Sequence, residues 1–143
     1  MLQHKFAWND YFTTTPVTTI SNREFGSRQT PSDPNVHVLN CLFNNITSTS
    51  GNGGALYCTS VTCLLVESSS FFSCKTISSH GGAILFDNQN NGECVLHEVC
   101  GNDCYSTYNS GTSYGQFAYI DVRDVVSSKN YINFSSIAHC VNE

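Results

Sequence analysis

One tetrapeptide recurs in this sequence and restricts the fold more than any other feature. Gly53-Gly54-Ala55-Leu56 returns 28 residues later as Gly81-Gly82-Ala83-Ile84, and Gly115-Gln116-Phe117-Ala118 is a degenerate third copy. A repeat of this length is typical of chains that stack one supersecondary unit on the next. Two glycines permit a tight corner with positive φ, and the apolar residues that follow can then point into a narrow core. We therefore expect the glycine pairs to lie one above the other in adjacent layers, with Leu56 and Ile84 both inward.

A second motif, an apolar residue followed three positions later by Asn or Cys, lies upstream of each glycine motif. Its copies are Leu42…Asn45, Phe71…Cys74, Val99…Asn102 and Ile137…Cys140. If these copies stack, Asn45 and Asn102 share one corner and can form a ladder of amides. Cys74 and Cys140 then take the same corner as small apolar substitutes, and we expect both to be buried and unbridged.

Short apolar runs separated by Ser- and Asn-rich turns fill the rest of the repeats, and no segment has a sustained helical period. We therefore predict an all-β fold, a right-handed parallel β-helix (a solenoid) of about four rungs over residues 36–143.

Residues 1–35 differ from the repeats, because they hold the only Trp and all three prolines. Phe6, Trp8, Tyr11 and Phe12 have no counterparts in the repeat motifs. We predict that this segment is an aromatic N-terminal cap or edge followed by a loop, with at least two of these rings buried against an end or flank of the stack.

The two motifs resemble the GGA[I/L/V] and FxxN halves of the repeat in polymorphic outer-membrane (Pmp) proteins, and similar repeats of protist surface-protein families. Phe is absent at Leu42 and Val99, and Phe71 is followed by Cys74 in place of Asn. The segments 99–105 and 115–120 also look like the tail of such protist proteins, so the resemblance covers about residues 36–140. It implies a pectin-lyase-like fold and a surface or adhesive role.

Charge and chain-wide patterns bear on partners and location. A net charge of −5 with six Lys+Arg argues against nucleic acid and anionic membranes, which require clustered cations. No apolar run is long enough to span a membrane, and the N-terminus lacks the apolar core of a signal peptide. We expect a cell-surface or extracellular location if this is part of a longer chain, and an intracellular location stays open.

The densest set of soft metal ligands is Cys94, His97, Cys100 and Cys104. Four such ligands within eleven residues could wrap a zinc ion tetrahedrally, but paired CxxC knuckles are missing. The alternative is a strand and corner with inward thiols, which we favour, so we predict no metal and no other cofactor. The repeat that holds Cys94, Cys100 and Cys104 is the least regular one, and a disulfide is most plausible there.

The nearest approach to a catalytic cluster is Asp121, Arg123 and Asp124. Asp121 and Arg123 share one face of a strand, which would suit acid–base chemistry on a polysaccharide but is more typical of an exposed ion pair. We therefore expect a non-catalytic repeat protein that presents a surface to a protein or a glycan. The alternatives are a structural component of a larger assembly, with a neighbouring subunit or further chain at one end of the stack, and a polysaccharide lyase or hydrolase.

Overall fold

The computed structural model describes residues 8–77, 80–108, 114–122 and 127–141, and these residues form an almost purely β structure. One short helix, α1 (Trp8–Tyr11), precedes the strands. The strands are β1 (Thr18–Ser21), β2 (Glu24–Phe25), β3 (Asn35–Leu39), β4 (Leu42–Asn44), β5 (Thr47–Ser48), β6 (Leu56–Cys58), β7 (Cys63–Glu67), β8 (Ser70–Phe72), β9 (Lys75–Thr76), β10 (Ile84–Asn88), β11 (Glu93–His97), β12 (Cys100–Asn102), β13 (Tyr105–Ser106), β14 (Ala118–Val122), β15 (Asn130–Asn133) and β16 (Ser136–Ala138).

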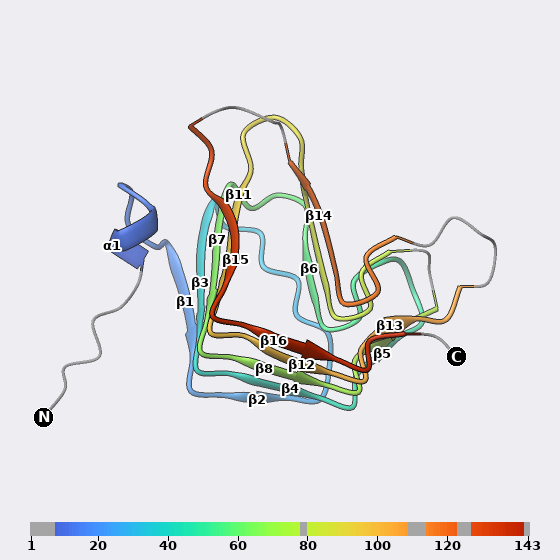
Figure 1. Cartoon of the computed structure of the whole chain (residues 1–143). Helices are drawn as coiled ribbons and strands as arrows, with labels where there is room; N and C mark the ends of the chain where they lie inside the picture. Colours follow the sequence, from blue (N-terminus) through green and yellow to red (C-terminus); the bar gives the residue numbers. More distant parts are fainter. Residues whose placement is uncertain (1–7, 78–79, 109–113, 123–126, 142–143) are drawn as a thin grey trace, which may run out of the picture.

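These strands form four sheets in which every pairing is parallel. Sheet A has the order β1-β3-β7-β11-β15, sheet B β16-β12-β8-β4-β2, sheet C β14-β10-β6 and sheet D β13-β9-β5. Consecutive strands always belong to different sheets. The chain thus adds a strand to one sheet after another, and each new strand lies beside the previous strand of the same sheet (Figure 1). We call each circuit a layer: β1–β2 is the first, β3–β6 the second, β7–β10 the third, β11–β14 the fourth and β15–β16 the last.

The glycine motifs stack as their spacing predicts. The Gly53 N–H donates to the His80 carbonyl at 3.0 Å, and the Gly54 N–H donates to the Gly81 carbonyl at 3.1 Å. Gly53 and Gly81 both have positive φ, at 72° and 65°. Leu56 and Ile84 are register partners, and both are fully buried. The third copy is also confirmed, since Gly115 has a φ of 63° and the Gly82 N–H donates to the Gln116 carbonyl.

The stacking predicted for the second motif is wrong by one position. Phe71 pairs with Phe43 rather than Leu42, so the residue stacked on Asn45 is Ser73, not Cys74. Every residue of this corner has positive φ, and the corner consists of Asn45, Ser73, Asp103 and His139. Left-handed backbone, which Asn tolerates better than most residues, thus determines the corner, and the shared Asn/Cys spacing was misleading.

Aromatic rings stack along the inner face of sheet B. The Phe25 and Phe43 ring centroids are 5.0 Å apart, and the Phe43 and Phe71 rings are parallel at 4.5 Å. Gly101 takes the next position in this column, which leaves room for a ring. Phe117, from the approach to sheet C, fills that room and meets Phe71 edge to face at 5.8 Å. The core therefore stays continuous although one strand lacks its aromatic residue.

The layers begin earlier than the sequence predicts, inside the segment 1–35. β1 pairs with β3 and β2 pairs with β4, so residues from Thr18 onward already belong to the first layer. The boundary expected at residue 36 does not coincide with any break in the stack. Motif spacing could not place these strands, because no glycine motif accompanies the first layer.

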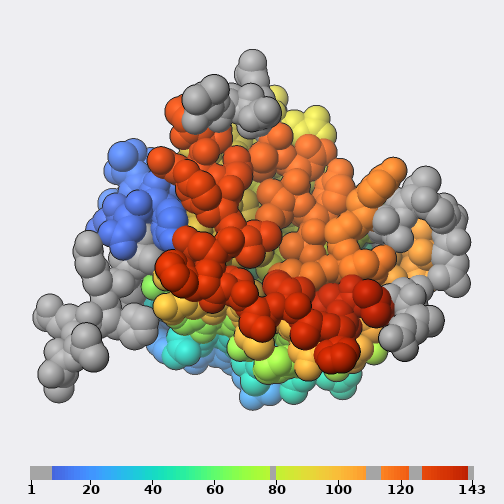
Figure 2. Space-filling model, in the orientation of Figure 1, coloured from blue at the N-terminus to red at the C-terminus, as the bar shows by residue number. Residues whose placement is uncertain are grey.

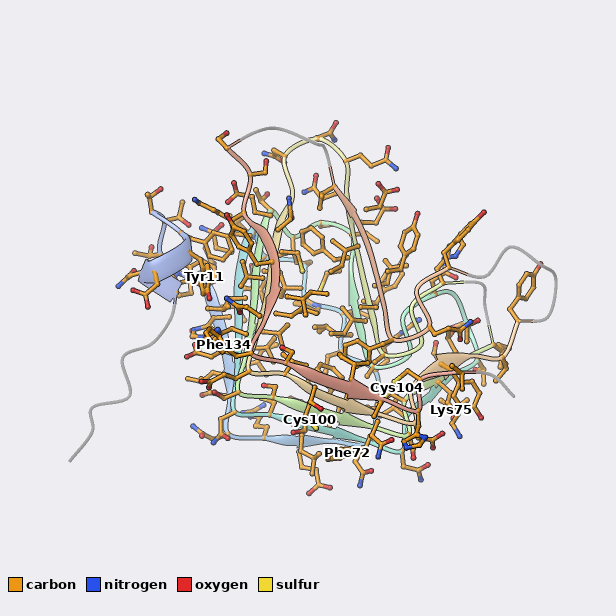
Figure 3. All side chains as sticks on the ribbon, viewed as in Figure 1. Tyr11, Phe72, Lys75, Cys100, Cys104 and Phe134 are labelled. Carbon is orange, nitrogen blue, oxygen red and sulfur yellow. The ribbon has the colours of Figure 1, made fainter. Side chains whose placement is uncertain are left out.

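The helix α1 covers the outer face of sheet A. Trp8 and Phe12 are 2% and 4% exposed and pack with Cys63, Leu65 and Val95 of β7 and β11. Figure 3 shows Tyr11 of α1 directed at the same sheet, where its hydroxyl contacts His97. The prediction that at least two N-terminal rings are buried against a flank is confirmed, and Phe6 lies outside the described residues.

Under α1 lies a buried pair of ionisable side chains. His37 Nε2 and Glu67 Oε2 are 2.8 Å apart, and both residues are almost fully buried. The Trp8 ring lies 5.7 Å from the His37 ring, centroid to centroid. Trp8 therefore shields this pair from water. Each side chain stabilises the other, because a buried charge without a partner lowers the stability of the fold.

Candidate binding face

The four candidate zinc ligands, Cys94, His97, Cys100 and Cys104, are not brought together. Cys94 points into the core, and its burial raises the pKa of its thiol to about 12. His97 lies on the opposite face of the same strand, where its Nδ1 contacts the Tyr11 hydroxyl and the Asn133 side chain. Cys100 and Cys104 lie apart along the wall formed by sheet B (Figure 3). Within the described ranges, no group of three or more His, Cys, Asp or Glu is arranged to hold a metal ion.

Cys104 belongs instead to a column of thiols one residue beyond the second-motif corner. Cys74, Cys104 and Cys140 follow Ser73, Asp103 and His139, and all three cysteines are unbridged. A hydrogen bond between the Cys74 and Cys104 thiols lowers the pKa of Cys74 and raises that of Cys104. Cys74 is buried as expected, but Cys140 in the last layer is only half-buried.

Replacing Cys74 with alanine should lower the free energy of unfolding by about 1–3 kcal/mol, because it leaves a cavity and removes the thiol partner of Cys104. The loss should be equal with and without reductant, since the thiol is free. Urea unfolding under both conditions measures it, and Cys100→Ala, at a half-exposed position, should have a smaller effect. A loss that vanishes under reductant would mean that Cys74 is bridged.

Of the three candidate catalytic residues, the structure describes only Asp121. Arg123 and Asp124 lie outside the described residues. Asp121 points outward from β14, since its neighbours Ile120 and Val122 pack against the core. Its Oδ2 accepts hydrogen bonds from Gln89 Nε2 at 2.7 Å and from the Tyr119 hydroxyl at 3.2 Å. The side chain is therefore held in one orientation by two neutral donors.

Tyr119 is one end of a stack of three rings. The His80 and Tyr119 rings are nearly parallel, with centroids 4.6 Å apart, and the Tyr114 ring lies 5.4 Å from the His80 ring on an adjacent turn. Tyr114 is 59% exposed. Partial burial, aided by the neighbouring Asp121 carboxylate, raises the pKa of the Tyr119 hydroxyl.

A polar pocket of about 460 Å³ adjoins the carboxylate end of this stack. Asp87 lines the pocket and is the register partner of Asp121 on the neighbouring strand. The other lining residues are Thr59, Asn88, Gln89, Asn90 and Asn91. We call the surface formed by His80, Tyr114, Tyr119, Asp87, Gln89 and Asp121 the ring–carboxylate face.

The sequence offered one unused signal for this face. His80 and Tyr114 each directly precede a repeat glycine, as Asn52 does in the copy before them. Residues at equal positions of stacked repeats must be neighbours, and the His80 N–H indeed donates to the Asn52 side chain. His80 and Tyr114, which look unrelated in the sequence, therefore belong to one column of stacked residues.

Comparison with family models, with curated proteins and with solved structures finds no match to this chain. Among the residues that the structure describes, no helix has the length and apolar character needed to cross a membrane.

Proposed function

We propose that this chain is a right-handed parallel β-helix of the Pmp-like repeat type that binds a neutral glycan on its ring–carboxylate face, in a non-catalytic surface or adhesive role. The observation that carries the proposal is the ring stack of Tyr114, His80 and Tyr119, which ends on the fixed Asp121 carboxylate. A cell-surface or extracellular location suits such a role and belongs to the same proposal.

The chemistry of this face matches that of a sugar ring. A pyranose has an apolar face of C–H groups, which packs well on an exposed aromatic ring such as Tyr114. Its hydroxyls are donors and acceptors, and the carboxylates of Asp87 and Asp121 with the amide of Gln89 offer both kinds of partner. Hydrogen bonds to a charged carboxylate are stronger than those between neutral groups.

Charge decides which glycans suit the face. Two carboxylates, Asp87 and Asp121, occupy neighbouring positions on it, and the whole chain carries a net charge of −5. Uronic acids and sulfated sugars would be repelled at such a surface. The proposal is therefore restricted to neutral sugars.

Replacing Tyr114 with alanine should raise the Kd for a neutral oligosaccharide about three- to tenfold, because the exposed ring platform is lost. The probes are matched panels of neutral and acidic oligosaccharides, followed by calorimetry on whichever neutral sugar binds. Tyr131→Ala is the control, since Tyr131 is an exposed tyrosine on sheet A. Absence of binding by every neutral sugar, or equal losses in the two variants, would contradict the proposal.

A polysaccharide hydrolase is the second candidate, because Asp87 and Asp121 occupy adjacent strands about 4.8 Å apart. Retaining glycosidases hold their two carboxyl groups at about 5 Å. Asp121→Asn separates the two functions: a hydrolase would lose all release of reducing ends, whereas a binding protein releases none in either form.

A further inference from the structure

In the last layer, side chains that point toward the core are exposed to solvent. Ile132 of β15 and Ile137 of β16 are 57% and 40% exposed, although they continue inward columns. Their register partners in earlier layers, such as Leu96 and Phe71, are fully buried. Figure 2 shows that residues of β14–β16, in orange and red, make up one face of the molecule. This face thus presents interior-type side chains.

The first layer presents a matching set at the opposite end. Ile20 of β1 belongs to the same inward column as Ile132, and Phe25 of β2 belongs to the same column as Ile137. Ile20 and Phe25 are only half-buried, because no described strand lies beyond them. β1 and β2 are also edge strands of sheets A and B, the sheets that end in β15 and β16.

We propose that the last layer of one copy of this chain stacks on the first layer of a second copy. β15 then pairs in parallel with β1 of the second copy and β16 with β2, so that Ile132 meets Ile20 and Ile137 meets Phe25. Edge strands with free backbone groups are templates for such pairing. This proposal does not depend on the glycan proposal, since different residues carry it.

A second copy is the occupant that the geometry favours. Each layer is already placed on the one before it by in-register parallel pairing, and the same displacement brings the first layer of another copy onto the last. Sheets A and B carry this contact, because sheet C ends one layer earlier, at β14, and Gln29, its first-layer member, would not reach that strand. The contact joins two different surfaces, so it does not close and builds linear assemblies.

The test uses one variant blocked at each end, Ile20→Lys in the first layer and Ile132→Lys in the last. Sedimentation velocity on the wild-type chain should show oligomers that grow with concentration. Each blocked variant alone should be monomeric, and a mixture of the two should form a 1:1 dimer that grows no further. Ile77→Lys is the matched control, because Ile77 is an exposed isoleucine that follows β9, away from both ends.

Three results would overturn the proposal: a wild-type chain that stays monomeric up to its solubility limit, a first-layer variant that still dimerises through two last layers, or loss of assembly in Ile77→Lys. Amide hydrogen exchange of the wild-type chain keeps the test valid if a variant does not fold. Exchange should slow in β1 and in β15 together as concentration rises, and slowing at one end alone contradicts stacking.

Discussion

Replacing Gly82 with alanine should strongly destabilise the fold of this chain. A Cβ at Gly82 would overlap backbone atoms of Gln116 and Tyr105, which both belong to the neighbouring layer, β11–β14. Backbone cannot rotate away as a side chain can, so two layers would have to separate. We expect a loss of about 4 kcal/mol or more in the free energy of unfolding, a large share of the stability of a domain of this size.

The matched control is Gly26→Ala, because a Cβ at Gly26 meets nothing within 4 Å and the residue is exposed. That variant should melt within a degree or two of the wild-type chain, as surface substitutions do at about ±0.5 kcal/mol. Circular dichroism and thermal melting compare the two variants. A Gly82→Ala protein that melts like the control would mean that the layers are not packed backbone to backbone at this corner.

Replacing Trp8 with alanine should cost about 3–5 kcal/mol, the usual range for truncation of a large buried aromatic residue. The loss has two sources here. Trp8 packs against Phe12 at 4.8 Å between ring centroids, and it covers the His37–Glu67 pair. Water that reaches this pair weakens its electrostatic attraction, which is stronger in a low-dielectric setting.

Asn9→Ala is the control for this prediction, because Asn9 lies in the same short helix but is exposed. It should change the free energy of unfolding by no more than about 0.5 kcal/mol. Urea titrations followed by circular dichroism measure both variants. If Trp8→Ala proved as stable as Asn9→Ala, the N-terminal segment would be a dispensable attachment rather than part of the packed fold.

The sequence predicted the glycine corners correctly because glycine has a backbone preference that no other residue shares. The second corner was misplaced because its determinant is also positive φ, which four different polar residues adopt here, Asn45, Ser73, Asp103 and His139. Strand register around Phe43 and Phe71 could be read only from the paired backbones. The sequence did not predict the first layer, because β1 and β2 carry no glycine motif.

The candidate site was predicted less well than the fold. Asp121 was singled out for its neighbour Arg123, whereas the described contacts of Asp121 are with Tyr119 and Gln89. Gln89 is far from Asp121 in sequence, and only the stacking of β10 on β14 joins them. The alternative of a zinc site could have been tested by strand alternation alone, because Cys94 and His97, three residues apart on one strand, must face opposite ways.

The exchange between Gly101 and Phe117 has a consequence for how this sequence can evolve. One ring fills one space, and the strand that carries Gly101 and the turn that carries Phe117 both reach that space. A phenylalanine can arise at position 101, as at Phe43 and Phe71, only after position 117 has become small. The two positions are thus sterically coupled, and a substitution of Gly101 by a large residue is tolerated only together with a smaller residue at position 117.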